Sequence, residues 1–184
     1  MALLQHDVLI VDQVRGFLND SFAIADVHGQ PAGWIRSEGG TASRLLMGNR
    51  KFLVEDADGA PVVRLNDVVS FGRERMQITA PDGSDLATLI QKISFLKTRI
   101  KLELANGREL QMDGSFFERD FTITSPELGE VARVGRQYRD IGQALLGRER
   151  YVLQFAPQLE PWQRATVIGA VIGIDIIRAK ARNN

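Results

Sequence analysis

The chain has 184 residues, and its 23 Lys and Arg residues are balanced by 23 Asp and Glu residues, so the formal net charge at pH 7 is zero. This balance removes the general electrostatic argument for a nucleic-acid partner, and we expect none. The chain has no cysteine, which excludes disulfides, thiolate metal ligands, cysteine nucleophiles and S-acylation.

A chain of this length can bury a sizeable core, so we expect one domain over residues 1–184. The first segment, MALLQHDVLIV, has neither a basic region nor a long apolar core. It is therefore a poor signal peptide, and we expect a protein that is cytoplasmic or peripheral to a membrane. The run HDVLIVDQ (6–13) is apolar enough to form a first strand.

The chain then repeats a small unit in which alternating apolar residues lead into a turn that ends in glycine. The copies are FAIADVHG (22–29), FLVEDADG (52–59), MQITAPDG (76–83), IKLELANG (100–107) and the longer FTITSPELG (121–129). Alternation places the apolar side chains on one face of a strand, and residues such as Asp-Gly and Asn-Gly turn the chain. Because each glycine is followed by another apolar run, every copy predicts a β-hairpin.

Five hairpins supply ten strands, and the runs at 6–13 and RERYVLQF (148–155) bring the expected number to about twelve. The closing glycines lie 30, 24, 24 and 22 residues apart, which suits successive hairpins of one antiparallel meander. An open sheet of this width would leave two exposed edges and would tend to curl. The sequence therefore predicts a mainly β protein, a closed antiparallel barrel of about twelve strands.

Two helices are expected late in the chain. The segment YRDIGQALLG (138–147) predicts a short helix with Gly147 as its C-terminal cap. A longer helix is expected over about 160–181, with Pro161 in its first turn and basic residues near its C-terminal end. The centre of the longer helix is apolar on all sides, which is typical of a buried core element or of a membrane span.

The longest uncharged part of this helix, Ala165–Ile174, has ten residues, whereas about 20 are needed to cross a bilayer. Asp175 follows directly, and a charge in hydrocarbon is costly. Ala165, Gly169 and Gly173 form a stripe of small residues that would let a helix fit inside a barrel. A twelve-stranded barrel is too wide to be filled by its own side chains. We therefore expect a buried central helix and no transmembrane span; a membrane-inserted or partner-facing helix is the alternative.

Three segments resemble one group of families. They are FAIADVHGQPAGWI (22–35), the run from FTITSPELG to RERYVLQFAP (121–157), and QLEPWQRATVIGAVIGIDIIRA (158–179). In this order they resemble the phospholipid scramblases and the plant LURP-one-related proteins, in which an apolar helix with an internal Asp ends the chain. The resemblance covers nearly the whole sequence. It implies the tubby C-terminal-like fold, a closed twelve-stranded barrel around a C-terminal helix.

Chemical motifs are few. His6 and His28 lack Cys partners and acidic pairs at ligand spacing, so we expect surface histidines and no metal site. The sequence DADG (56–59) resembles the start of an EF-hand loop, but its glycine comes too early, and a hairpin turn explains it. No nucleophile elbow, P-loop or zinc-protease motif is present. We therefore expect neither a catalytic residue nor a cofactor, and hence a protein that is not an enzyme.

The scramblase pattern also implies an acidic, calcium-linked segment before the last strand. The matching positions here are Gly147, Arg148, Glu149 and Arg150, with a single carboxylate between two arginines. Calcium needs several oxygen ligands, so we expect no calcium site there. The proline-rich extension and acylated cysteines of the animal scramblases are absent as well. Both departures argue against calcium-triggered lipid scrambling.

A basic face is the remaining surface feature. In FLKTRIKLEL (95–104) the apolar residues alternate with cations, and further arginines follow later in the chain; the candidates are Lys97, Arg99, Lys101, Arg133, Arg136 and Arg139. Tubby domains hold phosphoinositide headgroups with basic residues, so the resemblance implies an anionic lipid site here. The alternative is an ordinary solvated outer face. Asp175 likewise has two interpretations, a bond to a barrel backbone group or arginine, or a place in an internal ligand site.

The sequence thus favours a non-enzymatic, scramblase-like or LURP-one-related domain that binds phospholipid or a membrane surface without calcium. The alternative is a soluble protein-interaction or scaffold domain with no lipid role. A barrel that binds a small apolar ligand, or an enzyme of unrecognised type, comes third, because a helix inside the barrel leaves little room for a ligand.

Overall fold

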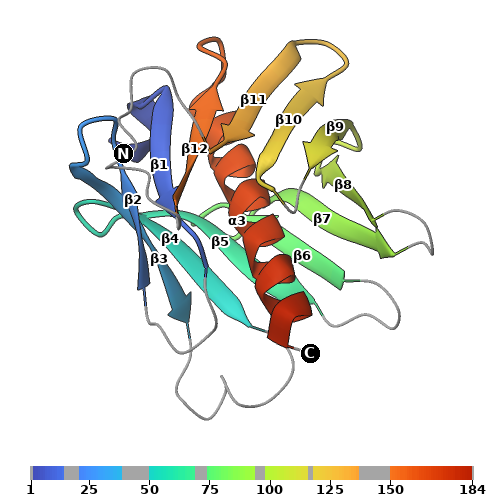
Figure 1. Ribbon diagram of the computed structural model, residues 1–184, viewed down its shortest axis with the longest axis horizontal. Coiled ribbons are helices and arrows are strands. Elements are labelled where there is room, and N and C mark those ends of the chain that lie inside the picture. Colours follow the sequence, from blue (N-terminus) through green and yellow to red (C-terminus); the bar gives the residue numbers. More distant parts are fainter. Residues whose placement is uncertain are drawn as a thin grey trace.

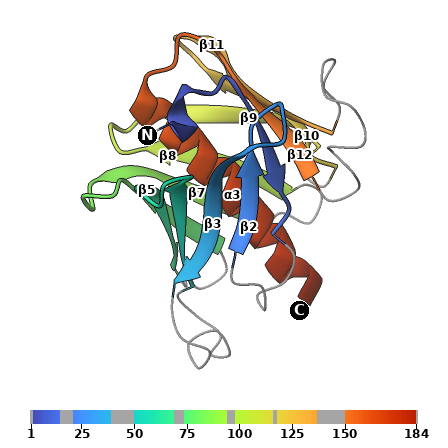
Figure 2. The ribbon, with the colours of Figure 1, turned by 90° about the vertical axis from the view of Figure 1, so that its left-hand side faces the viewer.

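The computed structural model describes residues 2–14, 21–38, 50–68, 74–93, 98–115, 118–136 and 150–183. Within these residues, twelve antiparallel strands form a closed barrel that surrounds a C-terminal helix (Figures 1 and 2). Each strand pairs with its neighbours along the chain, and β1 pairs with β12 to close the ring. The predicted fold class is therefore confirmed.

The elements follow the predicted order. A short 3-10 helix, η1 (Leu3–Gln5), precedes the barrel, and α3 (Pro161–Asn183) ends it. The strands are β1 (Val8–Asp12), β2 (Ser21–Ala25), β3 (Pro31–Glu38), β4 (Lys51–Asp56), β5 (Pro61–Val68), β6 (Glu74–Thr79), β7 (Asp85–Ile93), β8 (Thr98–Leu104), β9 (Glu109–Ser115), β10 (Asp120–Ser125), β11 (Gly129–Gly135) and β12 (Arg150–Phe155).

All five predicted hairpins form, as β2–β3, β4–β5, β6–β7, β8–β9 and β10–β11. Their glycines take up the positive φ that the turns require, for example 85° at Gly59. The Gly59 amide donates to the carbonyl oxygen of Asp56 at 2.9 Å. Every one of these hairpins begins with an even-numbered strand of the antiparallel meander, so all five turns lie at the same end of the barrel. We call this end the turn end.

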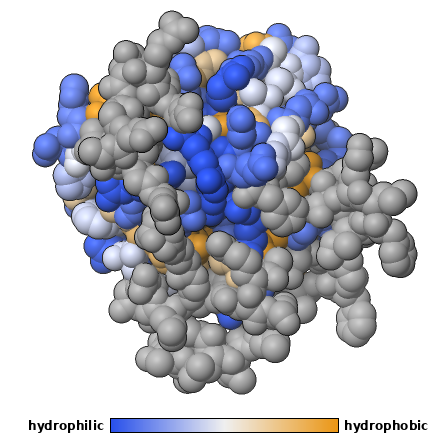
Figure 3. Space-filling model, in the orientation of Figure 1, coloured by the Kyte–Doolittle hydropathy of each residue, from blue (hydrophilic) through white to orange (hydrophobic). Residues whose placement is uncertain are grey.

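The barrel interior is filled by α3. Residues Ala165 to Ile177 are all buried, and the helix packs mainly on β5, β6 and β7. Inward residues of the strands complete the core: in β8, Ile100 and Leu102 are buried while Lys101 points outward. On the face shown in Figure 3 hydrophilic side chains form a central band, and hydrophobic ones appear only as small separate patches. None of the helices in the described ranges has the length and apolar character needed to cross a membrane.

Several sequence expectations fall outside the described residues. They include the short helix at 138–147, positions 147–149 of the calcium-linked segment, and the candidate cations Lys97 and Arg139. Of Arg99 only the backbone, within β8, is described.

Candidate functional site

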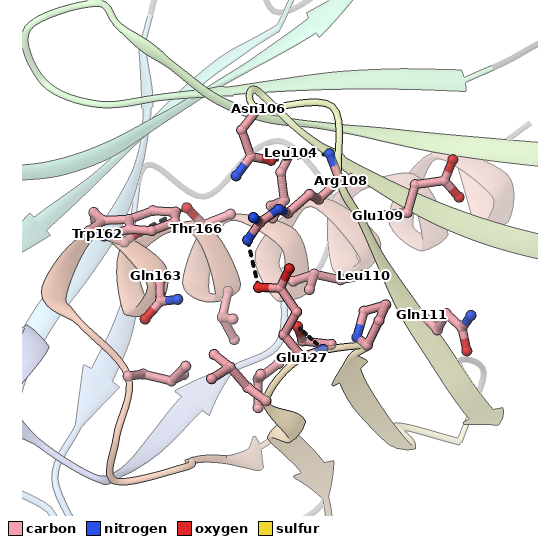
Figure 4. Close-up of a pocket in the computed structure, with 16 residues that line it drawn as sticks. Leu104, Asn106, Arg108, Glu109, Leu110, Gln111, Glu127, Trp162, Gln163 and Thr166 are labelled. Carbon is pink, nitrogen blue, oxygen red and sulfur yellow. Dashed lines mark hydrogen bonds and ion pairs between the residues drawn. The ribbon is translucent and has the colours of Figure 1, made fainter.

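A pocket opens at the turn end of the barrel, between two hairpin tips and the start of α3 (Figure 4). Its volume is about 310 Å³. Four buried side chains form an apolar floor, namely Leu110, Val131, Leu159 and Val167. Polar side chains and one indole form the rim, namely Asn106, Arg108, Glu127, Gln163 and Trp162.

The pocket exists because two hairpins part at their tips. The pairing of β9 with β10 reaches only to Gln111 and Thr124, while the pairing of β9 with β8 continues to Glu109 and Glu103. The β8–β9 tip therefore leans away from the β10–β11 tip. The first turns of α3 lie beneath the space left between them, with Val167 and Thr166 among its lining residues.

One ion pair connects the two tips across the opening. Arg108 Nη1 donates to Glu127 Oε2 at 2.6 Å, and the two side chains remain 61% and 57% exposed. In Figure 4 both charged groups lie in the opening, with Trp162 and Gln163 on the opposite, helix side. An ion pair this exposed contributes little to stability, so it can be exchanged for other partners at low cost.

The rim also carries most of the exposed large apolar side chains of the described residues. Trp162 is 47% exposed and Leu128 is 41% exposed, and both line the pocket. The third such residue, Val68, is 41% exposed but lies at the end of β5, away from the turn end. Two exposed apolar side chains that line the same apolar pocket make this end of the barrel the candidate binding surface.

A buried polar cluster lies farther along α3, around Asp175. Its Oδ1 accepts from Arg119 Nε at 3.1 Å and from Arg178 Nη1 at 3.2 Å, and its Oδ2 accepts from the Val14 amide at 3.2 Å. Burial raises the pKa of Asp175, and the two arginines oppose this rise. Asp175 thus has both kinds of bonding partner named from the sequence, a backbone group and arginines. This arrangement anchors the helix to the chain between β1 and β2 and to the residue before β10.

A tyrosine completes this cluster. The Arg119 guanidinium carbon lies 5.8 Å from the centre of the Tyr151 ring, and both side chains are buried. Burial raises the pKa of Tyr151 well above its ordinary value. The phenol therefore stays neutral, and we assign the cluster a structural role.

The basic candidates that the structure describes are largely paired with carboxylates. Lys101 forms ion pairs with Glu109 and with Glu103, the latter at 2.9 Å, and these hydrogen bonds, first that of Glu109, raise the pKa of Lys101. Arg133 makes two bonds to Glu130, at 3.0 and 2.7 Å, which raise its pKa. Arg136 is exposed just after β11. Lys101 and Arg133 lie three strand spacings apart, on β8 and β11.

The residues that the structure describes hold no group of three or more His, Cys, Asp and Glu side chains that could bind a metal ion. Asp56 of the DADG turn instead accepts hydrogen bonds from the amides of Leu3 and Ala57, at 3.2 and 2.8 Å. Arg150, at the end of the calcium-linked segment, donates to Asp12 at 2.6 Å. His28 lies exposed in its hairpin turn.

A closed antiparallel barrel around a buried C-terminal helix defines a protein of the tubby-like fold. The model of the LURP-one-related family matches residues 7–175, and the chain belongs to this family. A crystal structure of a protein from Arabidopsis thaliana is similar in fold, with a TM-score of 0.60 and 18% sequence identity over 95% of this chain and 93% of that one. No curated protein matches the chain.

The pocket has no counterpart among the sites expected from the sequence. Its residues come from three separate segments, which no spacing rule connects. Two signals were nevertheless present. The fifth repeat unit is one residue longer than the others, which places Leu128 in a wider turn, and Trp162 is the one aromatic residue of α3.

Proposed function

We propose that this protein is a non-enzymatic domain that binds phospholipid membrane surfaces without calcium, and that it makes contact through the turn end. The observation that carries the proposal is the joint exposure of Trp162 and Leu128 beside an apolar pocket. Exposed apolar side chains gathered at one end of a barrel favour insertion of that end into an interface.

The chemistry of the rim suits such an interface. Tryptophan prefers the headgroup level of a bilayer, where its ring is partly apolar and its N–H can find a partner. Arg108, Asn106 and Gln163 surround it and can bond lipid headgroups or water. The contact would be peripheral, because only side chains of turns and of the first helical turn enter the interface.

The basic face would add an electrostatic contribution to membrane binding. Lys101 and Arg133 share their charges with glutamates, so we expect the exposed apolar side chains, Trp162 and Leu128, to contribute more than these two cations. Binding should then persist on zwitterionic lipid and should strengthen moderately when anionic lipid is added.

Liposome flotation tests the proposal. The wild-type protein should float with both zwitterionic and anionic vesicles, equally with calcium and with chelator. The double variant Trp162→Ala/Leu128→Ser should lose flotation. Val68→Ser is the matched control, since Val68 is as exposed as Leu128 but lies away from the turn end, and it should float like the wild type.

Three results would contradict the proposal. If the wild-type protein ignores both kinds of vesicle at low salt, it has no lipid role, and a protein-interaction domain becomes the better conclusion. If Val68→Ser weakens flotation as much as the double variant does, the turn end is not the contact. A requirement for calcium would contradict the calcium-independent mode.

A further inference from the structure

The pocket at the turn end has two zones of different chemistry. Its floor is aliphatic and buried, built from Leu110, Val131, Leu159 and Val167. Its rim is polar and open to solvent, with charged groups on the hairpin side and an indole on the helix side (Figure 4). A cavity of this kind is complementary to an amphiphile, a molecule with one apolar and one polar end.

The volume limits the size of the apolar end. About 310 Å³ corresponds to roughly ten groups the size of a water molecule or methylene, at about 30 Å³ each. The cavity is therefore too small for the two acyl chains of a phospholipid. It has room for at most one alkyl segment of about ten carbons.

The charges on the rim indicate the chemistry of the ligand's polar end. Arg108 and Glu127 offer one positive and one negative group side by side, and the indole of Trp162 lies across the opening. The neighbouring Glu109 is paired with Lys101, so it does not bias the rim toward cations. A guanidinium binds phosphate, whereas an indole face and a carboxylate bind a quaternary ammonium.

We propose that this pocket binds a single-chain zwitterionic amphiphile of the phosphocholine type, with its chain on the apolar floor. The headgroup takes the place of the contact between Arg108 and Glu127, its phosphate on Arg108 and its ammonium group between Glu127 and Trp162. The proposal rests on the proposed function, because it concerns the same end of the barrel, and it adds the ligand of that end.

The apolar floor gives the proposal a quantitative signature. Each methylene moved from water to the floor should tighten binding about fourfold. The gain should continue until the chain has about ten carbons and should then level off, because longer chains extend beyond the cavity. A chain that merely lies on an open surface would show no such limit.

The experiment is a calorimetric titration with alkylphosphocholines from hexyl to tetradecyl, each kept below its critical micelle concentration. Affinity should rise about fourfold per methylene and level off near decyl. At equal chain length, alkyl sulfates and alkyltrimethylammonium salts should bind at least about tenfold more weakly, since each satisfies only half of the rim.

Variants locate the site. Leu110→Trp enlarges a side chain of the pocket floor and should abolish the chain-length dependence, while far-UV circular dichroism checks that the barrel still folds. Arg108→Gln should remove the preference for alkylphosphocholines over alkyltrimethylammonium salts. Glu127→Gln should remove the preference for alkylphosphocholines over alkyl sulfates. Arg36→Gln is the control, because Arg36 is similarly exposed, also pairs with a glutamate, Glu55, and does not line the pocket.

Several outcomes would overturn the inference. They are a flat chain-length series, equal binding of all three headgroups, or unchanged binding by a folded Leu110→Trp variant. If monomeric alkylphosphocholines do not bind while vesicles do, the pocket ligand is wrong and the membrane proposal stands. If the monomers bind with the expected limit while vesicles are ignored, the pocket stands and the membrane proposal fails.

Discussion

Gly169 of α3 lies directly against Ile78 of β6. A Cβ atom at position 169 would lie 2.6 Å from Ile78 Cγ2 and 3.4 Å from Val63 Cγ2, so this is where the helix and the barrel wall approach most closely along the stripe of small residues. Gly169→Ala should therefore overpack the core and lower the free energy of unfolding by about 1–3 kcal/mol. Denaturant unfolding measures the change.

Gly173→Ala is the matched comparison for this variant. A Cβ at 173 would first meet Leu89 Cδ2 at 3.1 Å, the far end of a side chain that can shift. Alanine also favours helix over glycine by about 1 kcal/mol. Gly173→Ala should therefore cost clearly less than Gly169→Ala. Equal costs at the two positions would show that the contact with Ile78 does not limit the packing.

Asp175 couples stability to pH in an unusual direction. Its pKa is raised from the model-compound value of 3.8 by burial, so the folded state holds this proton more tightly than the unfolded state does. Its contribution to stability is then complete below about pH 4 and is lost as the pH rises through the folded pKa. At low pH the folded state holds Asp175 as a neutral carboxylic acid, and asparagine has the same shape and keeps an acceptor oxygen for Arg119. Asp175→Asn should therefore cost only about 1 kcal/mol there.

The measurement is the difference in unfolding free energy between wild type and Asp175→Asn across pH 3 to 7. This difference should shrink as pH rises. Asp82→Asn should behave in the opposite sense, because hydrogen bonds from the Ser84 amide and hydroxyl lower the pKa of Asp82, so its contribution is lost as pH falls. A wild-type advantage over Asp175→Asn that grows with pH would refute the assignment.

Arg164 ties the start of α3 to the N-terminal segment. Its guanidinium donates to the carbonyl oxygen of His6 at 2.8 Å, to Asp7 at 2.7 Å and to the carbonyl oxygen of Leu159 at 3.2 Å, and it lies 5.3 Å from the Phe155 ring centre. A lysine cannot reach these acceptors together. Arg164→Lys should cost about 2–4 kcal/mol, a fall in melting temperature of roughly 5–15 °C.

The control for Arg164→Lys is Arg36→Lys. Arg36 is mostly exposed and pairs with Glu55 at 2.7 Å on the outer face of the barrel. Its replacement should change the free energy of unfolding by less than about 0.5 kcal/mol. Similar melting temperatures for the two variants would mean that the bonds of Arg164 do not hold the helix start.

The basic face makes a separate prediction about lipid binding. If Lys97, Arg99 and Lys101 contact anionic lipid, replacing all three by glutamine should weaken binding to anionic vesicles by roughly an order of magnitude or more at low salt. The loss should diminish as salt rises, because the Debye length falls from about 10 Å at 0.1 M to about 3 Å at 1 M. Flotation at two salt concentrations measures it. Unchanged flotation at low salt would exclude these cations from the contact.

Strand content, hairpin order and barrel closure could be determined from the sequence alone, because each depends on short-range patterns. In the unit 52–59, alternation buries Phe52 and Val54, and Gly59 takes the positive φ that ends the strand. The buried position of α3 was favoured by the sequence over a membrane-inserted or partner-facing helix, since its uncharged stretch, Ala165–Ile174, is too short to span a bilayer. These inferences required only the period of the side chains and the length of the segment.

The pocket and the pairing of surface charges were decided by the tertiary structure. Arg108 and Glu127 belong to different hairpins, and only the folded barrel brings their side chains into contact. The two hairpin tips diverge below this ion pair and leave an apolar floor that includes Leu159. Lys101, which looked like part of a basic face, is paired with Glu109 of the next strand. A period of two assigns each side chain to the inner or outer face of a barrel. The distances between side chains on neighbouring strands depend instead on register and on how the hairpins pack on the helix beneath them.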